Sequence, residues 1–247
     1  MNKRIAIAVI TLLLAGRTYA ILLRHDIDVD KSKELATSFE SAVRLGGGHG
    51  TLIAPRWVIT AAHVAEGLRI GQRVRFRNGT ESRISRVIFH PDWNGRPSFE
   101  AADMALVQLA HLIDGITPAR LNAAAGEEGS SIWLVGSGVT GDGRTGPTHE
   151  DEVFRAATNI IDAADERFLR FSFSEPPDAT ELEGISGPGD SGGPAYRKTD
   201  DGWEIIGVSS MNDGPGGNRC CRYGSNEYYS RISTSIEWIR SVIESSD

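Results

Sequence analysis

Short apolar segments recur along the chain, and turn-forming residues separate most of them. Apolar and charged side chains alternate over 73–77, and the following Asn78-Gly79 favours a tight hairpin. The other apolar segments are 51–54, 57–60, 84–88, 104–109, 132–135, 153–161, 169–173, 203–210 and 228–232. Short strands at nearly regular spacing are typical of barrels and sandwiches, so we predict an all-β fold.

Only the C-terminal segment has a clear helical period. Its apolar side chains recur at spacings of three and four and share one helical face: Ile236, Ile239, Val242 and Ile243. We predict a helix over about 233–244, with Ser233 or Ser235 as the capping residue. A short helical turn is expected over 31–40. Three stretches rich in glycine or turn residues are expected to be loops: 136–146, 175–190 and 212–218.

Residues 1–20 have the pattern of a secretory signal. Lys3 and Arg4 precede an apolar run over 5–15, and the segment ends on the small residue Ala20. The run is too short to span a bilayer comfortably, and no later stretch approaches the length of a membrane helix. We therefore expect cleavage after Ala20, export to the periplasm or the medium, and no stable membrane insertion afterwards. An uncleaved membrane anchor is the alternative.

Composition narrows the classes of partner and cofactor. The 247 residues include 26 Lys and Arg against 33 Asp and Glu, a formal net charge of −7. Such an acidic balance argues against a nucleic-acid partner, which needs a basic surface. The two cysteines, Cys220 and Cys221, are adjacent, so a strained vicinal disulfide, free thiols and pairing with another molecule all stay open. No metal-ligand spacing is present, and we expect no metal and no cofactor.

The sharpest candidate for chemistry is the segment Gly189-Asp190-Ser191-Gly192-Gly193-Pro194. A nucleophilic serine needs a tight turn that leaves backbone N–H groups free to bind a developing oxyanion. Glycine tolerates unusual dihedral angles and leaves its N–H unshielded. An ordinary Gly/Pro turn is the structural alternative, but this order of residues is far more specific than such a turn requires.

A histidine and an acid complete the candidate constellation. His63 follows the apolar run 57–60 and two small alanines, which leave room for an imidazole at a crevice. Imidazole titrates near neutrality, so it can accept a serine proton and return it to a leaving group. Asp103 precedes an apolar strand, where an acid is costly unless it is paired. Asp92 is the rival acid, and a capping role is the structural alternative for Asp103.

These segments resemble the trypsin/chymotrypsin serine peptidases, in which the triad occurs in the order His, Asp, Ser. The matching segments are Thr60-Ala-Ala-His63, Asp103-Met-Ala-Leu106 and Gly189–Pro194, with support from Gly50–Ile53 and Tyr229–Ile232. The resemblance implies two antiparallel six-stranded β-barrels and a C-terminal helix. It places the N-terminal barrel at about 38–118, the C-terminal barrel at about 119–232, and the triad in the cleft between them.

The resemblance also implies the chemistry. Ser191 is the nucleophile, His63 its base and Asp103 the residue that orients His63, while the N–H groups of Gly189 and Ser191 form the oxyanion hole. Ser210 binds substrate backbone and supports the acid. The implied function is a secreted serine endopeptidase that acts on protein or peptide substrates. The alternative is a catalytically silent homologue that serves as a protein-binding module.

Several positions depart from the family pattern. Val64 and Gly187 stand where the family commonly has disulfide cysteines. Ile185 stands where trypsin-like enzymes carry the aspartate that selects Arg or Lys, which argues against simple tryptic specificity. Glu227 falls near the wall of the specificity pocket, where it could attract a basic side chain, block part of the pocket or point to solvent.

Removal of the signal would expose Ile21 as a new N-terminus. Family members insert such an Ile or Val amine beside the aspartate that precedes the serine, which is Asp190 here. The spacing from Ile21 to His63 is close to that of the family. We therefore expect an activating ion pair between Ile21 and Asp190. A surface N-terminal extension is the alternative.

Overall fold

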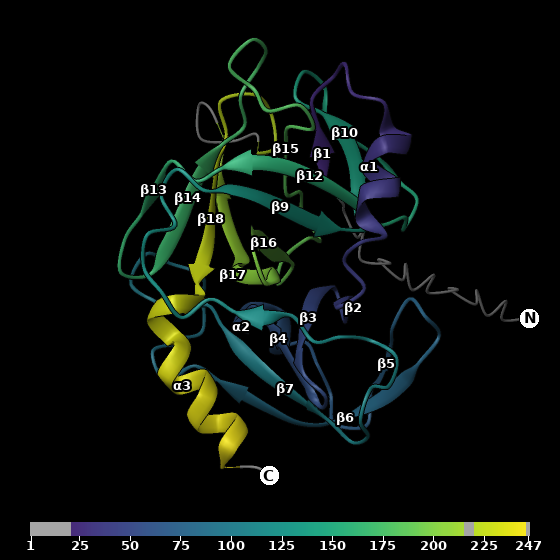
Figure 1. Cartoon of the computed structure of the whole chain (residues 1–247), viewed down its shortest axis with the longest axis vertical. Coiled ribbons are helices and arrows are strands. Elements are labelled where there is room, and N and C mark those ends of the chain that lie inside the picture. The colour runs from purple at the N-terminus through teal and green to yellow at the C-terminus, as the bar shows by residue number, and fades with distance from the viewer. Residues whose placement is uncertain (1–20, 215–219, 246–247) are drawn as a thin grey trace, which may run out of the picture.

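The computed structural model describes residues 21–214 and 220–245, so the predicted signal segment 1–20 lies outside the described residues. Strands dominate this part of the chain. They form two barrel-like halves, one above the other in Figure 1, and the yellow helix at the C-terminus lies beside the lower one. The predicted all-β fold with two barrels and a C-terminal helix is confirmed.

The lower barrel is one antiparallel sheet with the strand order β2-β3-β4-β7-β6-β5. Its elements are β2 (Ala42–Leu45), β3 (Gly48–Ala54), β4 (Trp57–Thr60), the one-turn helix α2 (Ala62–Ala65), β5 (Arg73–Arg75), β6 (Glu81–Phe89) and β7 (Ala105–Leu109). The alternation seen over 73–77 has the expected effect: Val74 and Phe76 are buried in the barrel, whereas Arg73 and Arg75 are exposed.

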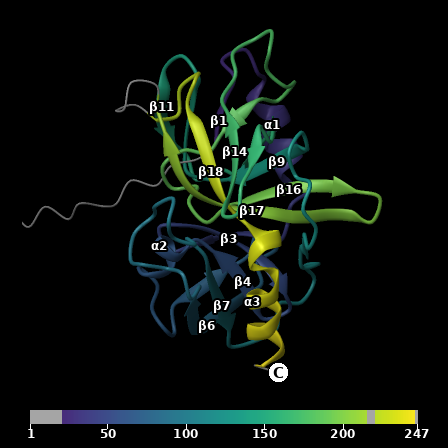
Figure 2. The same ribbon diagram turned by 90° about the vertical axis from the view of Figure 1, so that its left-hand side faces the viewer.

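The upper half contains two sheets. The larger follows the order β12-β9-β16-β17-β18-β14-β13, with β8 beside β17, and the smaller is β11-β10-β1-β15. Their strands are β1 (Leu22–Leu23), β8 (Arg120–Leu121), β9 (Ser131–Gly136), β10 (Val139–Asp142), β11 (Gly146–Glu150), β12 (Arg155–Ile160), β13 (Ala163–Ala164), β14 (Phe168–Ser172), β15 (Gly184–Ile185), β16 (Pro194–Thr199), β17 (Gly202–Asp213) and β18 (Asn226–Arg231). In Figure 2 the hairpin of β16 and β17 projects to one side of the molecule.

The loop predicted over 136–146 was wrong for part of that range, because it contains the last residue of β9, all of β10 and the first residue of β11. The loop predicted over 175–190 was wrong at β15, and the one over 212–218 was wrong at the end of β17, while its residues 215–218 lie outside the described residues. Strands β10 and β11 lack the apolar alternation by which strands are recognised in a sequence. Their backbones are instead paired with each other and, through Leu23 and Asp142, with β1. The pairing of β10 with β1 therefore involves a segment more than a hundred residues earlier in the chain.

The helices also correct the predicted boundaries. Helix α1 (Val29–Ala36) starts before the predicted turn, and Asp28 caps it by accepting the Asp30 N–H at 3.0 Å. Helix α3 (Ile232–Glu244) has Arg231 as its N-cap residue, so the predicted caps Ser233 and Ser235 were wrong. The reason is that β18 runs directly into α3, and the helix begins before either serine.

A buried ion pair fastens the connection between the two barrels to the start of α3. The Glu127 side chain is fully buried, and the Arg231 guanidinium donates to both of its oxygens at 3.0 and 2.7 Å. Asn122 and Ser233 donate to the same carboxylate. The buried Glu127 carboxylate stabilises the fold only while its donors are all present, because the loss of one donor leaves negative charge that nothing compensates.

Replacing Arg231 with Met is expected to lower the free energy of unfolding by about 3–5 kcal/mol, the usual cost of leaving a buried charge unpaired. Urea denaturation measures the change. The matched control is Arg120→Met, because Arg120 and Asp201 form an ion pair whose side chains are 54% and 76% exposed. That control should lose less than about 1 kcal/mol. Equal losses in the two variants would contradict the importance given to the Glu127 site.

Candidate active site

The strand register of the lower barrel brings His63 and Asp103 together. Thr60 at the end of β4 pairs with Ala105 at the start of β7, so the residues just beyond each pairing lie side by side. The His63 Nδ1 and Asp103 Oδ2 atoms are 2.6 Å apart, and the His63 backbone N–H donates to Asp103 Oδ1 at 2.9 Å. Two hydrogen bonds thus fix the imidazole and the turn that carries it.

Asp103 is fully buried and receives donors from the other barrel as well. Ser210 on β17 donates to Asp103 Oδ2 at 2.7 Å, and Ser230 on β18 donates to the Asp103 carbonyl at 3.0 Å. An ionised carboxylate only accepts hydrogen bonds, so Nδ1 of His63 carries the proton. Nε2 is then the basic nitrogen, on a side chain that keeps 25% of its surface exposed.

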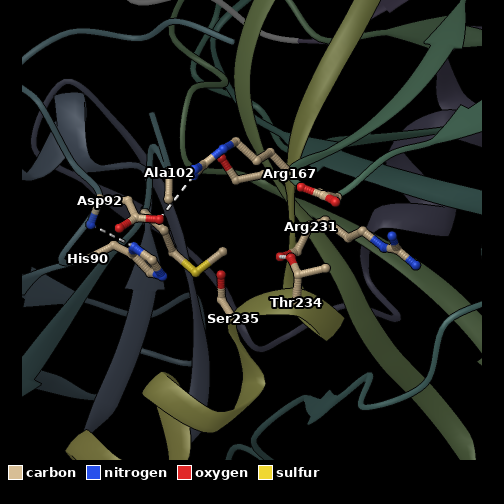
Figure 3. A pocket seen from close by; sticks show the side chains of 10 residues that line it. His90, Asp92, Ala102, Arg167, Arg231, Thr234 and Ser235 are labelled. Carbon is tan, nitrogen blue, oxygen red and sulfur yellow. Dashed lines mark hydrogen bonds and ion pairs between the residues drawn. The ribbon is translucent and has the colours of Figure 1, made fainter. Parts of the chain in front are cut away.

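The rival acid Asp92 lies elsewhere. Figure 3 shows Asp92 beside His90 and facing Arg167, at a cavity of about 160 Å³ near the start of α3. Asp92 Oδ2 forms an ion pair with Arg167 Nη1 at 3.1 Å, and 54% of its side chain is exposed. Of the two candidate acids, the structure places Asp103 and not Asp92 on His63.

Ser191 stands on the turn between β15 and β16, and glycines allow that turn. Gly189 and Gly192 have φ angles of +95° and +78°, a region that other residues rarely adopt. A Cβ atom on Gly192 would lie 2.3 Å from both Thr60 Oγ1 and the carbonyl oxygen of His49. The serine turn can therefore lie directly on the segment that leads to His63.

Two backbone donors near Ser191 are free. Within the described residues, the N–H groups of Gly189 and Ser191 donate to no other group of the chain. The neighbouring Gly192 and Gly193 N–H groups, by contrast, donate to the carbonyls of Ser209 and Asp190 at 2.8 Å. The two residues predicted as the oxyanion hole thus have the donors that the role requires.

The Asp190 side chain points away from solvent, into the upper half. Its Oδ2 accepts the Gly187 N–H at 2.9 Å, whereas Oδ1 has no hydrogen-bond partner among the described residues. Burial raises the pKa of Asp190 well above its usual range. Ile21 is fully buried, and the next residue, Leu22, pairs with Ile185 of β15, on the segment that leads to Asp190.

The candidate pocket residues are buried as well. Ile185 has no exposed surface and packs in an apolar cluster with Ile21 and Leu22. Glu227 is 1% exposed and accepts the Ser186 N–H at 2.8 Å, so the alternative in which it points to solvent is wrong. Burial raises the pKa of Glu227 well above its usual range, and the nearby Asp190 adds to the rise.

The His49 side chain, for which no role is predicted from the sequence, lies against the serine turn. Its imidazole is buried and bonds Gly189 and Ser137. In the sequence His49 lies between two glycines, a local pattern that does not indicate a contact with a distant turn. The two cysteines are free thiols in the structure, and Cys221 is fully buried in the cluster that contains Ile21.

Comparison with known proteins decides the family, because the family model described as Trypsin matches residues 28–239. The chain belongs to the trypsin family. It is 26% identical over 218 residues to Chymotrypsin-like elastase family member 1 of Felis catus, which covers 79% of this chain and 78% of the relative. Collagenase of Hypoderma lineatum is 29% identical over 212 residues, with 77% and 74% covered. Trypsin 5G1 of Aedes aegypti is 26% identical over 219 residues, with 80% and 77% covered.

Membership of the trypsin family supports a serine endopeptidase in general. The family resemblance inferred from the three motif segments is thereby confirmed. A buried acid whose pKa is raised makes the free energy of unfolding depend on pH. The pH dependence therefore tests whether Glu227 is buried as the structure has it.

Replacing Glu227 with Gln is expected to flatten the pH dependence of stability above pH 4.5. Between the ordinary glutamate pKa of 4.5 and the raised native pKa, the unfolded chain releases a proton that the native state keeps. The free energy of unfolding therefore falls as pH rises in this window. Urea denaturation at pH 5 and pH 8 should show a smaller drop in Glu227→Gln than in the wild type. The exposed-site control Glu128→Gln should keep the wild-type drop, and an unchanged drop in Glu227→Gln would contradict the placement.

Proposed function

We propose that this trypsin-family chain is an exported serine endopeptidase that cleaves protein or peptide substrates through Ser191, His63 and Asp103. The observation that carries the proposal is the 2.6 Å contact between His63 Nδ1 and the buried Asp103 carboxylate. This contact selects the tautomer in which Nε2 can accept a proton. The glycine-rich turn of Ser191, lying against the segment before His63, supplies the matching nucleophile.

In the proposed mechanism, Ser191 Oγ attacks the carbonyl carbon of the scissile peptide bond while His63 Nε2 takes its proton. Asp103 stabilises the imidazolium that results. The N–H groups of Gly189 and Ser191 donate to the oxyanion. His63 then gives its proton to the leaving amine, which leaves an acyl group on Ser191. Water repeats the sequence with His63 as base and releases the acid product.

The substrate-binding proposal rests on Ile185, Ser210 and Glu227. An apolar Ile185 offers no charge to an Arg or Lys side chain, which argues against simple tryptic specificity. Glu227, on a strand that pairs with the one carrying Ser210, accepts the backbone N–H of Ser186, the residue that follows Ile185. Its raised pKa favours the neutral form, which suits polar or apolar substrate side chains better than a cationic one.

Export rests on the signal-like pattern of residues 1–20. Among residues 21–214 and 220–245, no helix combines the length and the apolar character needed to cross a bilayer. We propose cleavage after Ala20, with release to the periplasm or the medium.

Activation would then follow from the same cleavage. The freed amine of Ile21 is proposed to pair with Asp190 Oδ1, which is buried and has no hydrogen-bond partner in the described chain. The full burial of Ile21 and the pairing of Leu22 with Ile185 support this arrangement over a surface extension. The ion pair would neutralise the buried carboxylate beside Ser191.

A catalytically silent homologue that binds proteins is the other function open to this fold. Replacing Ser191 with Ala separates the two, because the endopeptidase should lose about six orders of magnitude in kcat. Hydrolysis of a fluorogenic peptide by the purified mature protein measures the loss. The exposed-serine control Ser131→Ala should keep wild-type turnover. Turnover that persists in Ser191→Ala protein would contradict the assignment of the nucleophile.

Retaining Ala20 before Ile21 is expected to lower kcat/KM about 100-fold, because a peptide-bonded nitrogen cannot carry the ammonium charge that Asp190 needs. Asp190→Asn should cause a similar loss, and the two changes together should lose little more than either alone. N-terminal sequencing establishes which residue begins the mature chain. Full activity of the version that retains Ala20 would defeat the activation proposal while leaving the triad proposal intact.

A further inference from the structure

His49 is a buried histidine that the proposed mechanism does not use. It lies on β3 of the lower barrel, is 2% exposed, and faces the turn of Ser191. Its backbone is held on both sides: its N–H donates to the Ser191 carbonyl at 2.8 Å, and Thr60 Oγ1 donates to its own carbonyl at 2.6 Å. The position of the imidazole relative to the serine turn is therefore set by the main chain.

The hydrogen bonds of the imidazole define its tautomer. Nδ1 lies 2.8 Å from the carbonyl oxygen of Gly189, which only accepts, so Nδ1 must carry the proton. Nε2 accepts the backbone N–H of Ser137 at 3.0 Å and lies 2.9 Å from its hydroxyl oxygen. A proton on Nε2 would oppose that N–H. Burial lowers the pKa of His49 to about 4, so the ring stays neutral near neutral pH.

The bond to Gly189 reaches the oxyanion hole directly. Gly189 supplies one of the two free N–H groups. Because glycine has no Cβ atom, its φ of +95° is only one of many conformations open to it, and other contacts must hold it there. Its carbonyl belongs to the peptide that leads into Asp190 and Ser191. An anchored carbonyl fixes the orientation of that peptide, and it limits how the donors on either side can turn. Donors that are oriented before the reaction need no rearrangement when charge develops.

We propose that His49 is a positioning residue that holds the oxyanion hole through its Nδ1–H bond to Gly189, an inference that rests on the proposed endopeptidase function. A side chain of the lower barrel thus orients the oxyanion donors of the upper barrel through a single hydrogen bond. The competing explanation is that His49 only fills space, since its ring also packs edge-on against Phe154 at 5.6 Å between centroids.

Two amide variants separate these explanations because their side chains differ in length and so place the amide nitrogen at different positions. The amide nitrogen of Asn occupies the place of Nδ1, so His49→Asn can keep the bond to Gly189. The longer His49→Gln places its amide near the position of Nε2, toward Ser137, and leaves the Gly189 carbonyl without a donor. Both replacements are polar and similar in volume. A space-filling role predicts similar activity for the two.

The proposal predicts that His49→Gln lowers kcat for a peptide substrate about 10–100-fold, a fraction of the loss seen when an oxyanion donor is deleted. KM should stay within about twofold, because the oxyanion donors act mainly on the transition state. His49→Asn should recover kcat to within about threefold of the wild type. Ser137→Ala, which keeps both the Gly189 bond and the backbone donor to Nε2, is the matched control and should retain wild-type kcat.

A second readout concerns binding alone. The affinity for a peptidyl boronic acid, which forms a tetrahedral anion on the serine, should fall in His49→Gln by the same factor as kcat/KM. In a Ser191→Ala background, the Kd of the uncleaved peptide should not change when His49→Gln is added. Equal kcat in the Gln and Asn variants, or a boronate affinity equal to that of the wild type, would overturn the positioning role. If the wild type itself neither turns over peptide nor binds the boronate, the proposed function fails, a result distinct from active wild type with active His49→Gln.

Discussion

The arrangement of the site depends on one buried carboxylate that must be satisfied from both barrels. Asp103 leaves the lower barrel just before β7, and its charge is fully removed from water. His63 on its own barrel supplies two donors, and Ser210 on the upper barrel supplies a third. Because an unpaired charge in this place would be strongly destabilising, the same hydrogen bonds that orient the imidazole also fix how the two barrels meet.

The turn that carries Ser191 is held in a different way from Asp103: small residues allow its close approach, and hydrogen bonds to its backbone fix its position. Gly192 lets it approach the segment before His63 within contact distance, and His49 bonds the Ser191 and Gly189 carbonyls. Asp190 turns inward under this turn with one oxygen unsatisfied. Residues of the lower barrel thereby contact the turn of the upper barrel that carries Ser191, which explains why the two barrels cannot be considered separately.

The fold class and the pairing of His63 with Asp103 could be predicted from the sequence, because strands with apolar alternation and short motifs leave local signals. The sequence favoured Asp103 over Asp92 through the buried strand that follows Asp103, and the structure places that acid on His63. Features that depend on distant pairing were missed. The strand β10 pairs with the distant β1 as well as with the neighbouring β11, and the role of His49 depends on a turn far along the chain. The burial of Glu227 against Ser186 could not be predicted from the strand alone, since the sequence of β18 does not determine which of its two faces turns inward.

The measurement that tests the central claim most directly is covalent labelling by a fluorophosphonate, with the modified residue located by mass spectrometry. The account predicts a single adduct on Ser191 in the mature protein. It also predicts that Asp103→Asn slows labelling by about 10⁴-fold, the loss expected when the histidine is held in the wrong tautomer. A wild-type protein that is not labelled, or an Asp103→Asn variant labelled at the wild-type rate, would contradict the account.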